Sequence, residues 1–188
     1  MLKAANTPSP ALSWRPLRAI VRPQRPHPQL QDWLLDSGSL TARLIAKSDG
    51  QFRVRVLRQF IGVPRLDERQ ILGMQRSTLA LVREVILYGE DQPWVFARSL
   101  LPLASLTGSL RHLRKQNNRP LGAFLFSQPQ LTRSPIALAR ISRDHTYVPG
   151  ELMGAEPLWG RRSVFYLEQK PLLVSEVFLP AFVARLDA

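Results

Sequence analysis

The sequence of 188 residues contains no cysteine. This absence excludes a disulfide-stapled secreted module, a thiolate zinc site, an iron–sulfur cluster and a cysteine nucleophile. Apolar runs are short, and none approaches the roughly 20 residues that a membrane-spanning helix needs. The N-terminus also lacks the compact apolar stretch and small-residue cleavage site of a signal peptide. We therefore expect a cytoplasmic protein with no integral membrane segment.

Acidic residues are scarce, at 14 against 26 lysines and arginines, so the formal net charge is +12. This charge favours anionic partners without choosing among nucleic acid, lipid and small acids. The three histidines, His27, His112 and His145, do not lie at metal-ligand spacing, and no nucleophile-elbow sequence supports Ser/His/Asp catalysis. We expect no metal site.

Residues 1–28 contain six prolines and five basic residues but no acid. Proline lacks a backbone N–H and has a fixed φ, so this segment cannot sustain a helix or a central strand. We expect a flexible or extended lead-in over residues 1–28, followed by one domain over residues 29–188.

A helical hairpin is predicted over residues 29–47. Leu30, Trp33 and Leu34 fall on one helical face, and Ser39 is placed to cap a second helix after the turn at 37–38. A DNA-binding helix-turn-helix would explain the same pattern. The second helix, however, offers only Arg43 and Lys47 as basic contacts, which disfavours that reading.

The remaining chain is dominated by residues that favour strands. Alternation of apolar and polar residues and a composition rich in β-forming residues predict strands at 52–57, 78–88, 94–103, 136–141, 163–168 and 172–179. Short apolar runs predict two helices, at 110–115 and 121–126. Short connections at 89–93 and 169–171 predict antiparallel hairpins. The pattern indicates an α+β fold, a single antiparallel β-sheet with helices covering an enclosed ligand pocket.

In several predicted strands, one charged residue lies among apolar residues whose side chains point to the same face. Arg83 and Glu84 do so on the two faces of one strand, and Arg98 and Glu176 each do so on one face of another strand. A lone charge in a dry interior costs several kcal/mol unless it is paired. These residues therefore form either a structural Arg–Glu pair in the core or an enclosed site for a small anion, and spacing alone leaves both open.

Short motifs in a constant order make the chain resemble the chorismate lyase family, the bacterial chorismate pyruvate-lyases. The resemblance covers about residues 29–180. It rests on LQDWLL at 30–35, SLT at 39–41, REVIL at 83–87, QPW at 92–94, Arg98, LP at 101–102, PLG at 120–122, LF at 125–126, LTR at 131–133, LWGRRS at 158–163, KPLL at 170–173 and SEVFLP at 175–180.

The resemblance implies a monomer whose ligand lies beneath helical flaps and whose reaction needs no cofactor. That reaction converts chorismate into 4-hydroxybenzoate and pyruvate, the first committed step of ubiquinone biosynthesis. The family's ligand-contacting positions fall on Leu40, Arg83, Leu121 and Glu176, with Arg83 and Glu176 in catalytic roles. Arg98 is a weaker candidate for binding the second carboxylate.

The chain departs from the family pattern in three places. Leucine stands at position 40, where methionine is common, which matters to the pocket only if the side chain shapes it. The long proline-rich lead-in before residue 29 and residues 145–157, which resemble an insertion, affect the surface and the flaps. The resemblance also leaves a second function open, because effector-binding domains of one class of bacterial repressors look like this fold. Such a repressor would need a DNA-binding domain, which the proline-rich lead-in is too short to supply.

A nucleic-acid-binding function is less favoured. Trp33, Trp94 and Trp159 lie in apolar contexts that are typical of core rather than of an exposed stacking surface. Arg161 and Arg162 are neighbours on a predicted strand, so we expect one to point inward and the other outward.

Overall fold

A computed structural model describes residues 11–115 and 119–186. Its centre is one seven-stranded antiparallel sheet with the strand order β1-β2-β3-β7-β6-β4, in which β5 also pairs with β6. The strands are β1 (Phe52–Gly62), β2 (Ala80–Gly89), β3 (Gln92–Pro102), β4 (Thr132–Arg133), β5 (Ala137–Ile141), β6 (Leu158–Leu167) and β7 (Lys170–Phe178). The predicted α+β fold with one antiparallel sheet is confirmed.

Within residues 11–115 and 119–186, five α-helices flank this sheet. They are α1 (Pro28–Leu34), α2 (Leu40–Lys47), α3 (Leu66–Ile71), α4 (Leu121–Phe126) and α5 (Pro180–Leu186). The predicted hairpin of α1 and α2 and the predicted helix α4 are present, whereas residues 108–115 form a 3-10 helix. The sequence missed α3 and α5, which are only six and seven residues long and offer little periodicity. No helix among the described residues is long and apolar enough to cross a membrane.

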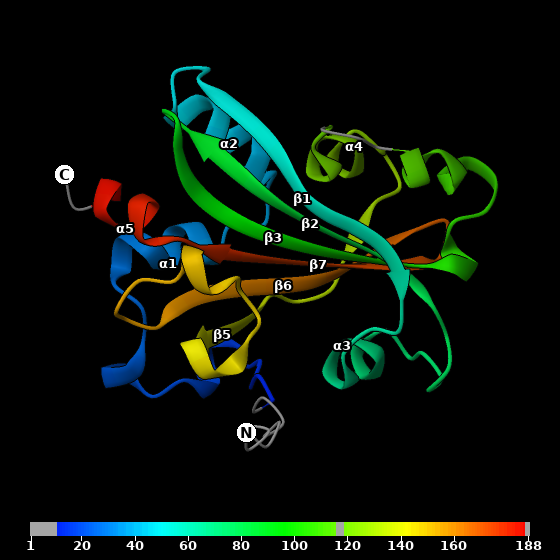
Figure 1. Cartoon of the computed structure of the whole chain (residues 1–188), viewed down its shortest axis with the longest axis horizontal. Helices are drawn as coiled ribbons and strands as arrows, with labels where there is room; N and C mark the ends of the chain where they lie inside the picture. Colours follow the sequence, from blue (N-terminus) through cyan, green and yellow to red (C-terminus); the bar gives the residue numbers. More distant parts are fainter. Residues whose placement is uncertain (1–10, 116–118, 187–188) are drawn as a thin grey trace, which may run out of the picture.

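Both faces of the sheet are covered. On one face, α1, α2 and α5 pack over one end of β2 and β3, and α4 packs with the 3-10 helix Gly108–Lys115 over the other end. On the second face, residues 12–14, α3 and the segment 143–153 pack on the sheet, and Figure 1 shows α3 apart from α2 and α4. The side chains of β2 and β3 are buried on both faces of the sheet. The alternation of residues along these strands therefore could not show which face is inside.

Residues 11–27, which we call the strap, follow an extended path on the surface of the domain, one of the two forms expected for the lead-in over residues 1–28. Leu12 is buried, and Arg15 and Leu138 exchange backbone hydrogen bonds at 2.8 and 2.7 Å. Leu17 and Ile20 pack against the cluster of α1 and α5, so the strap joins the domain before the predicted boundary at residue 29. The prolines limit regular structure to the short 3-10 helices Leu17–Ala19 and Arg22–Gln24, and Arg15 pairs with Leu138 of β5. The first ten residues of the predicted lead-in lie outside the described part of the chain.

The predicted insertion at 145–157 forms part of the second face. Tyr147, Val148 and Met153 are buried there against Phe96. The segment therefore covers the sheet rather than extending away from it.

The packing of the strap predicts a stability loss when its buried leucine is truncated. Leu12→Ala should lower the free energy of unfolding by about 2–5 kcal/mol, because a buried leucine loses both transfer energy and packing. Val21→Ala is the matched control, since Val21 lies in the same strap with 59% of its surface exposed. Denaturant unfolding of both variants measures this, and equal stabilities would show that the strap contributes nothing to the domain.

Candidate active site

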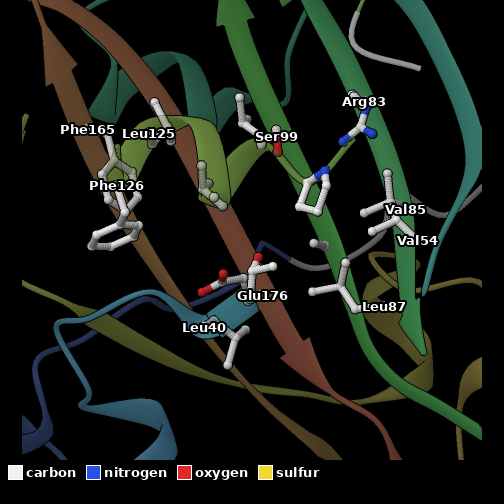
Figure 2. A pocket seen from close by; sticks show the side chains of 16 residues that line it. Leu40, Val54, Arg83, Val85, Leu87, Ser99, Leu125, Phe126, Phe165 and Glu176 are labelled. Carbon is white, nitrogen blue, oxygen red and sulfur yellow. The ribbon is translucent and has the colours of Figure 1, made fainter. Parts of the chain in front are cut away.

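A pocket lies between the first face of the sheet and the helices α2 and α4. It is lined by Leu40, Thr41, Val54, Arg83, Val85, Leu87, Ala97, Ser99, Pro120, Leu121, Gly122, Leu125, Phe126, Phe165, Val174 and Glu176. Figure 2 shows these side chains converging from the strands and from both helices. The cavity volume is only about 30 Å³, so α2 and α4 are closed down on the sheet.

Strand register brings Arg83 and Glu176 to the same face. Arg83 on β2 lies opposite Ser99 on β3, and Glu176 on β7 lies opposite Ala97 on β3. Ala97 and Ser99 point to one side of β3, so both charges reach one pocket. Their strands are separated by β3, a spacing of about 10 Å, and Figure 2 shows Arg83 and Glu176 apart from each other across the pocket.

Arg83 is the one basic residue among the described residues that line the pocket. Its side chain is buried, with 2% of the residue surface exposed, and Nη2 donates to the carbonyl oxygen of Arg119 at 3.1 Å. Burial lowers the pKa of the guanidinium, because the low dielectric disfavours the charged form. Guanidinium nevertheless stays protonated at neutral pH, so the pocket has a fixed positive charge.

Glu176 contributes the negative charge of the pocket. Its Oε2 accepts a hydrogen bond from Nε of Arg161 at 2.7 Å, and 16% of the side chain remains exposed. Among the described residues, none donates a hydrogen bond to Oε1 of Glu176. The ion-pair partner of Glu176 is therefore Arg161 rather than Arg83.

Leu40 and Leu121 occupy matching positions at the starts of the two covering helices. Leu40 follows the cap Ser39, whose Oγ accepts from the backbone N–H of Ala42, and Leu121 follows Pro120. Amides of a first helical turn have no acceptor within the helix, so both positions present N–H groups beside the pocket. The four predicted residues Leu40, Arg83, Leu121 and Glu176 are thus brought together.

Sequence reasoning missed smaller lining residues that close the pocket. A Cβ placed on Gly122 would lie 3.1 Å from Oγ1 of Thr41, so glycine permits the close approach of α4 to α2. Ser99 supplies a buried hydroxyl on the strand between the two charges. The sequence contained indications of these residues. Thr41 and Gly122 lie within the motifs at 39–41 and 120–122, and Ser99 lies on the strand that pairs with the strand of Arg83.

Arg98 corrects the prediction of a second carboxylate-binding residue. It points to the opposite face of β3, where it donates to Glu68 of α3 at 2.6 and 3.0 Å and to Glu84 at 2.5 Å. Burial opposes its charge, but the hydrogen bonds and charge of Glu68 outweigh burial, so the pKa of Arg98 lies above its usual value. Arg98 and Glu84 are the structural Arg–Glu pair that the alternation allowed, and α3, which supplies Glu68, was not foreseen.

The described residues contain no group of three or more His, Asp or Glu side chains that could hold a metal ion. The titratable groups of the pocket itself are the guanidinium of Arg83 and the carboxylate of Glu176. Such a pair can bind an anion at one end and a hydrogen-bond donor at the other.

Comparison with known proteins gives a family match over most of the chain. The family model described as chorismate lyase matches residues 13–186. A protein of Azoarcus sp. named probable chorismate pyruvate-lyase is 44% identical, covering 96% of this chain and 97% of that protein. A protein of the same name from Pseudomonas aeruginosa is 45% identical, covering 82% of this chain and 85% of that protein.

Solved structures share the fold at low sequence identity. The effector domain of PhnF from Mycobacterium smegmatis has a TM-score of 0.55 at 17% identity, covering 78% of this chain and 91% of that domain. The C-terminal domain of a histidine utilization repressor from Pseudomonas syringae has a TM-score of 0.52 at 11% identity, covering 69% and 92% respectively. At these identities the likeness concerns the fold alone.

The ion pairs on the second face predict that Arg98 is a structural residue. Arg98→Ala should cost about 3–5 kcal/mol of stability, because it leaves the buried carboxylate of Glu68 without its arginine partner and leaves Glu84 paired with Arg58 alone. Arg55→Ala is the control, since Arg55 is an exposed residue of the edge strand β1 and should change stability by less than about 0.5 kcal/mol. Thermal unfolding decides the matter, and an Arg98→Ala protein as stable as the control would contradict the assignment.

Proposed function

The chain belongs to the chorismate lyase family, and from that premise we propose that it converts chorismate into 4-hydroxybenzoate and pyruvate. The observation that carries the proposal is the convergence of Leu40, Arg83, Leu121 and Glu176 on one closed pocket. We extend the proposal to the first committed step of ubiquinone biosynthesis, which the resemblance implies. A monomeric state and the lack of a nucleic-acid partner stay predictions.

The reaction is an elimination that makes an aromatic ring. Chorismate has a ring carboxylate, an enolpyruvyl ether and, on the neighbouring ring carbon, a hydroxyl group. The ether C–O bond breaks, the hydroxyl-bearing carbon loses its proton, and the enolpyruvate takes up a proton to become pyruvate. Aromatisation drives the reaction, so the protein must mainly hold the dianion in a reactive conformer and stabilise the charge that develops on the departing oxygen.

Arg83 suits the stabilisation of negative charge. Its guanidinium is buried and fixed near Ser99 and the apolar lining, where a charge acts more strongly than in water. In the proposed reaction it binds a carboxylate of chorismate or the ether oxygen. The fixed position means that little reorganisation is needed when the charge develops.

Glu176 suits the hydroxyl end of the substrate. One of its oxygens is held by Arg161, and the carboxylate faces the pocket. In the proposed reaction it accepts a hydrogen bond from the ring hydroxyl and serves as the base or as the group that orients the ring. In the proposed reaction the backbone N–H groups of Leu40 and Leu121 bind a carboxylate of the substrate.

The closed cavity predicts movement of the covering helices. Its volume of about 30 Å³ is far below the roughly 300 Å³ of a typical small-molecule pocket. The substrate must therefore displace α2 or α4 to enter, and closure behind it excludes water. A product that fits the same pocket leaves only when the helices open, which makes product release the slow step.

A ligand-binding module without catalysis is the second candidate function. The observation that favours it is the shared fold with the effector domain of PhnF. It predicts binding of a small anion without any conversion of chorismate, so one turnover assay separates the two candidates.

Purified protein treated with a chelator should release equimolar 4-hydroxybenzoate and pyruvate from chorismate. The reason is that the charges of the pocket come from Arg83 and Glu176, which need no metal for an elimination of this kind. Absorbance of the aromatic product and a coupled pyruvate assay measure the two yields. Activity that disappears with the chelator and returns with a divalent ion would contradict the proposed mechanism, and absence of turnover would favour the binding module.

Removing the charge of Arg83 should impair turnover more than folding. Arg83→Ala should lower kcat/KM by roughly 100-fold or more, the usual effect of losing a preorganised charge-stabilising donor. Steady-state kinetics and thermal unfolding should be measured together. A folded and fully active Arg83→Ala protein would refute the assigned site.

Glu176→Gln keeps the shape of the side chain but loses its charge, so it should lower turnover in a folded protein. Glu168→Gln is the control, because Glu168 lies in the exposed turn between β6 and β7 and does not line the pocket. Its kcat/KM should stay within about 2-fold of the parent protein, as expected for a site remote from the chemistry. Equal kinetics for the two variants would remove Glu176 from the mechanism.

A further inference from the structure

Arg161 connects the carboxylate of the pocket to the turn that precedes the covering helix α2. It lies on β6 with 1% of its surface exposed, and it faces Glu176 directly across the β6–β7 ladder. Nε donates to Oε2 of Glu176 at 2.7 Å, and Nη1 donates to the carbonyl oxygens of Trp33 and Asp36 at 2.8 and 2.7 Å. Arg161 does not line the pocket itself.

The carbonyl acceptors belong to the end of α1 and to the turn after it. Carbonyl groups at a helix C-terminus lack partners within the helix, so a buried cation there satisfies them. Arg133 binds the same turn, because its Nη1 donates to the carbonyl oxygens of Asp36 and Ser37 at 3.3 and 3.0 Å. The buried guanidinium of Arg161 and the half-buried guanidinium of Arg133 therefore hold the turn from which α2 starts.

The geometry points to Arg161 as a positioning residue for Glu176, an inference that rests on the proposed function. The planar guanidinium holds one carboxylate oxygen with Nε while Nη1 is fixed by the two carbonyl groups. This arrangement limits rotation of the carboxylate and leaves Oε1 for the substrate hydroxyl. It also ties the orientation of Glu176 to the place where α2 begins, so closure of α2 and alignment of the carboxylate occur together.

Arg162 is a matched control on the same strand. It is 8% exposed, and its Nη1 donates to Asp67 of α3 at 2.7 Å, but it points to the second face of the sheet. The expectation that one member of the Arg161–Arg162 pair points outward is wrong, because both faces are covered. Arg162 therefore reports on the loss of a buried ion pair without contact with Glu176.

A double-mutant cycle tests whether Arg161 acts through Glu176. Arg161→Gln should lower kcat roughly 10- to 100-fold in the parent protein, but less than about 3-fold in a Glu176→Gln background, since the carboxylate that it positions is already gone. Arg161→Lys keeps the charge but cannot hold the carboxylate and both carbonyl groups, so it should recover only part of kcat. Arg162→Gln should lower the melting temperature while kcat stays within about 3-fold.

The outcomes separate the inference from the proposed function. No turnover by the parent protein would overturn the proposed function itself. If the parent protein turns over and Arg161→Gln lowers kcat by the same factor in both backgrounds, the positioning role alone is overturned. An unchanged kcat in Arg161→Gln or in Arg161→Lys would overturn it as well. If Arg161→Gln does not fold, Arg161→Lys is taken through the same cycle, and failure of both to fold would assign Arg161 to the fold and contradict the inference.

Discussion

Burial of the central sheet on both faces is the constraint on which the other features depend. A charged side chain in the middle of β2, β3, β6 or β7 is buried whichever face of the sheet it points to, because both faces are covered. Desolvation of an unpaired charge costs several kcal/mol, so each buried charge needs a partner in the layer that covers it. The short helix α3 and the turn between α1 and α2 supply such partners, which explains why segments with little apolar character are held firmly in place.

The two faces resolve this constraint in different ways. On the second face, Arg58, Glu84 and Arg98 lie in one row across the strands, and together with Glu68 of α3 they form a cluster of two cations and two carboxylates. On the first face, Arg83 and Glu176 are separated by β3 and face a shared cavity. The paired charges stabilise the packing of a layer, whereas the separated charges create a field across a pocket, and a field across a pocket can act on a bound anion.

The same scaffold serves different purposes in other proteins. The likeness to the effector domain of PhnF extends over 91% of that domain, yet only 17% of the residues are identical. Fold alone therefore does not assign a reaction, and the side chains of the pocket must carry that argument. In this chain those side chains are the buried guanidinium of Arg83 and the carboxylate of Glu176, with Leu40 and Leu121 at the starts of two helices beside them.

The sequence by itself determined the α1–α2 hairpin and most of the strands, since apolar periodicity is a local property, but it missed β4 and the first five residues of β6. The resemblance to the family, which depends on the order of short motifs, selected five pocket residues, and four of them line the pocket. The sequence could not place Arg98, because alternation shows only that Arg98 and Ser99 point to opposite faces and not which face holds the pocket. It also could not show that Leu12 and Arg15 pack on the sheet, or that Arg161 holds Glu176. Those contacts join residues far apart in the chain, and only the tertiary structure decides them, because a buried charge or an extended strap takes its partner from whatever layer folds over it.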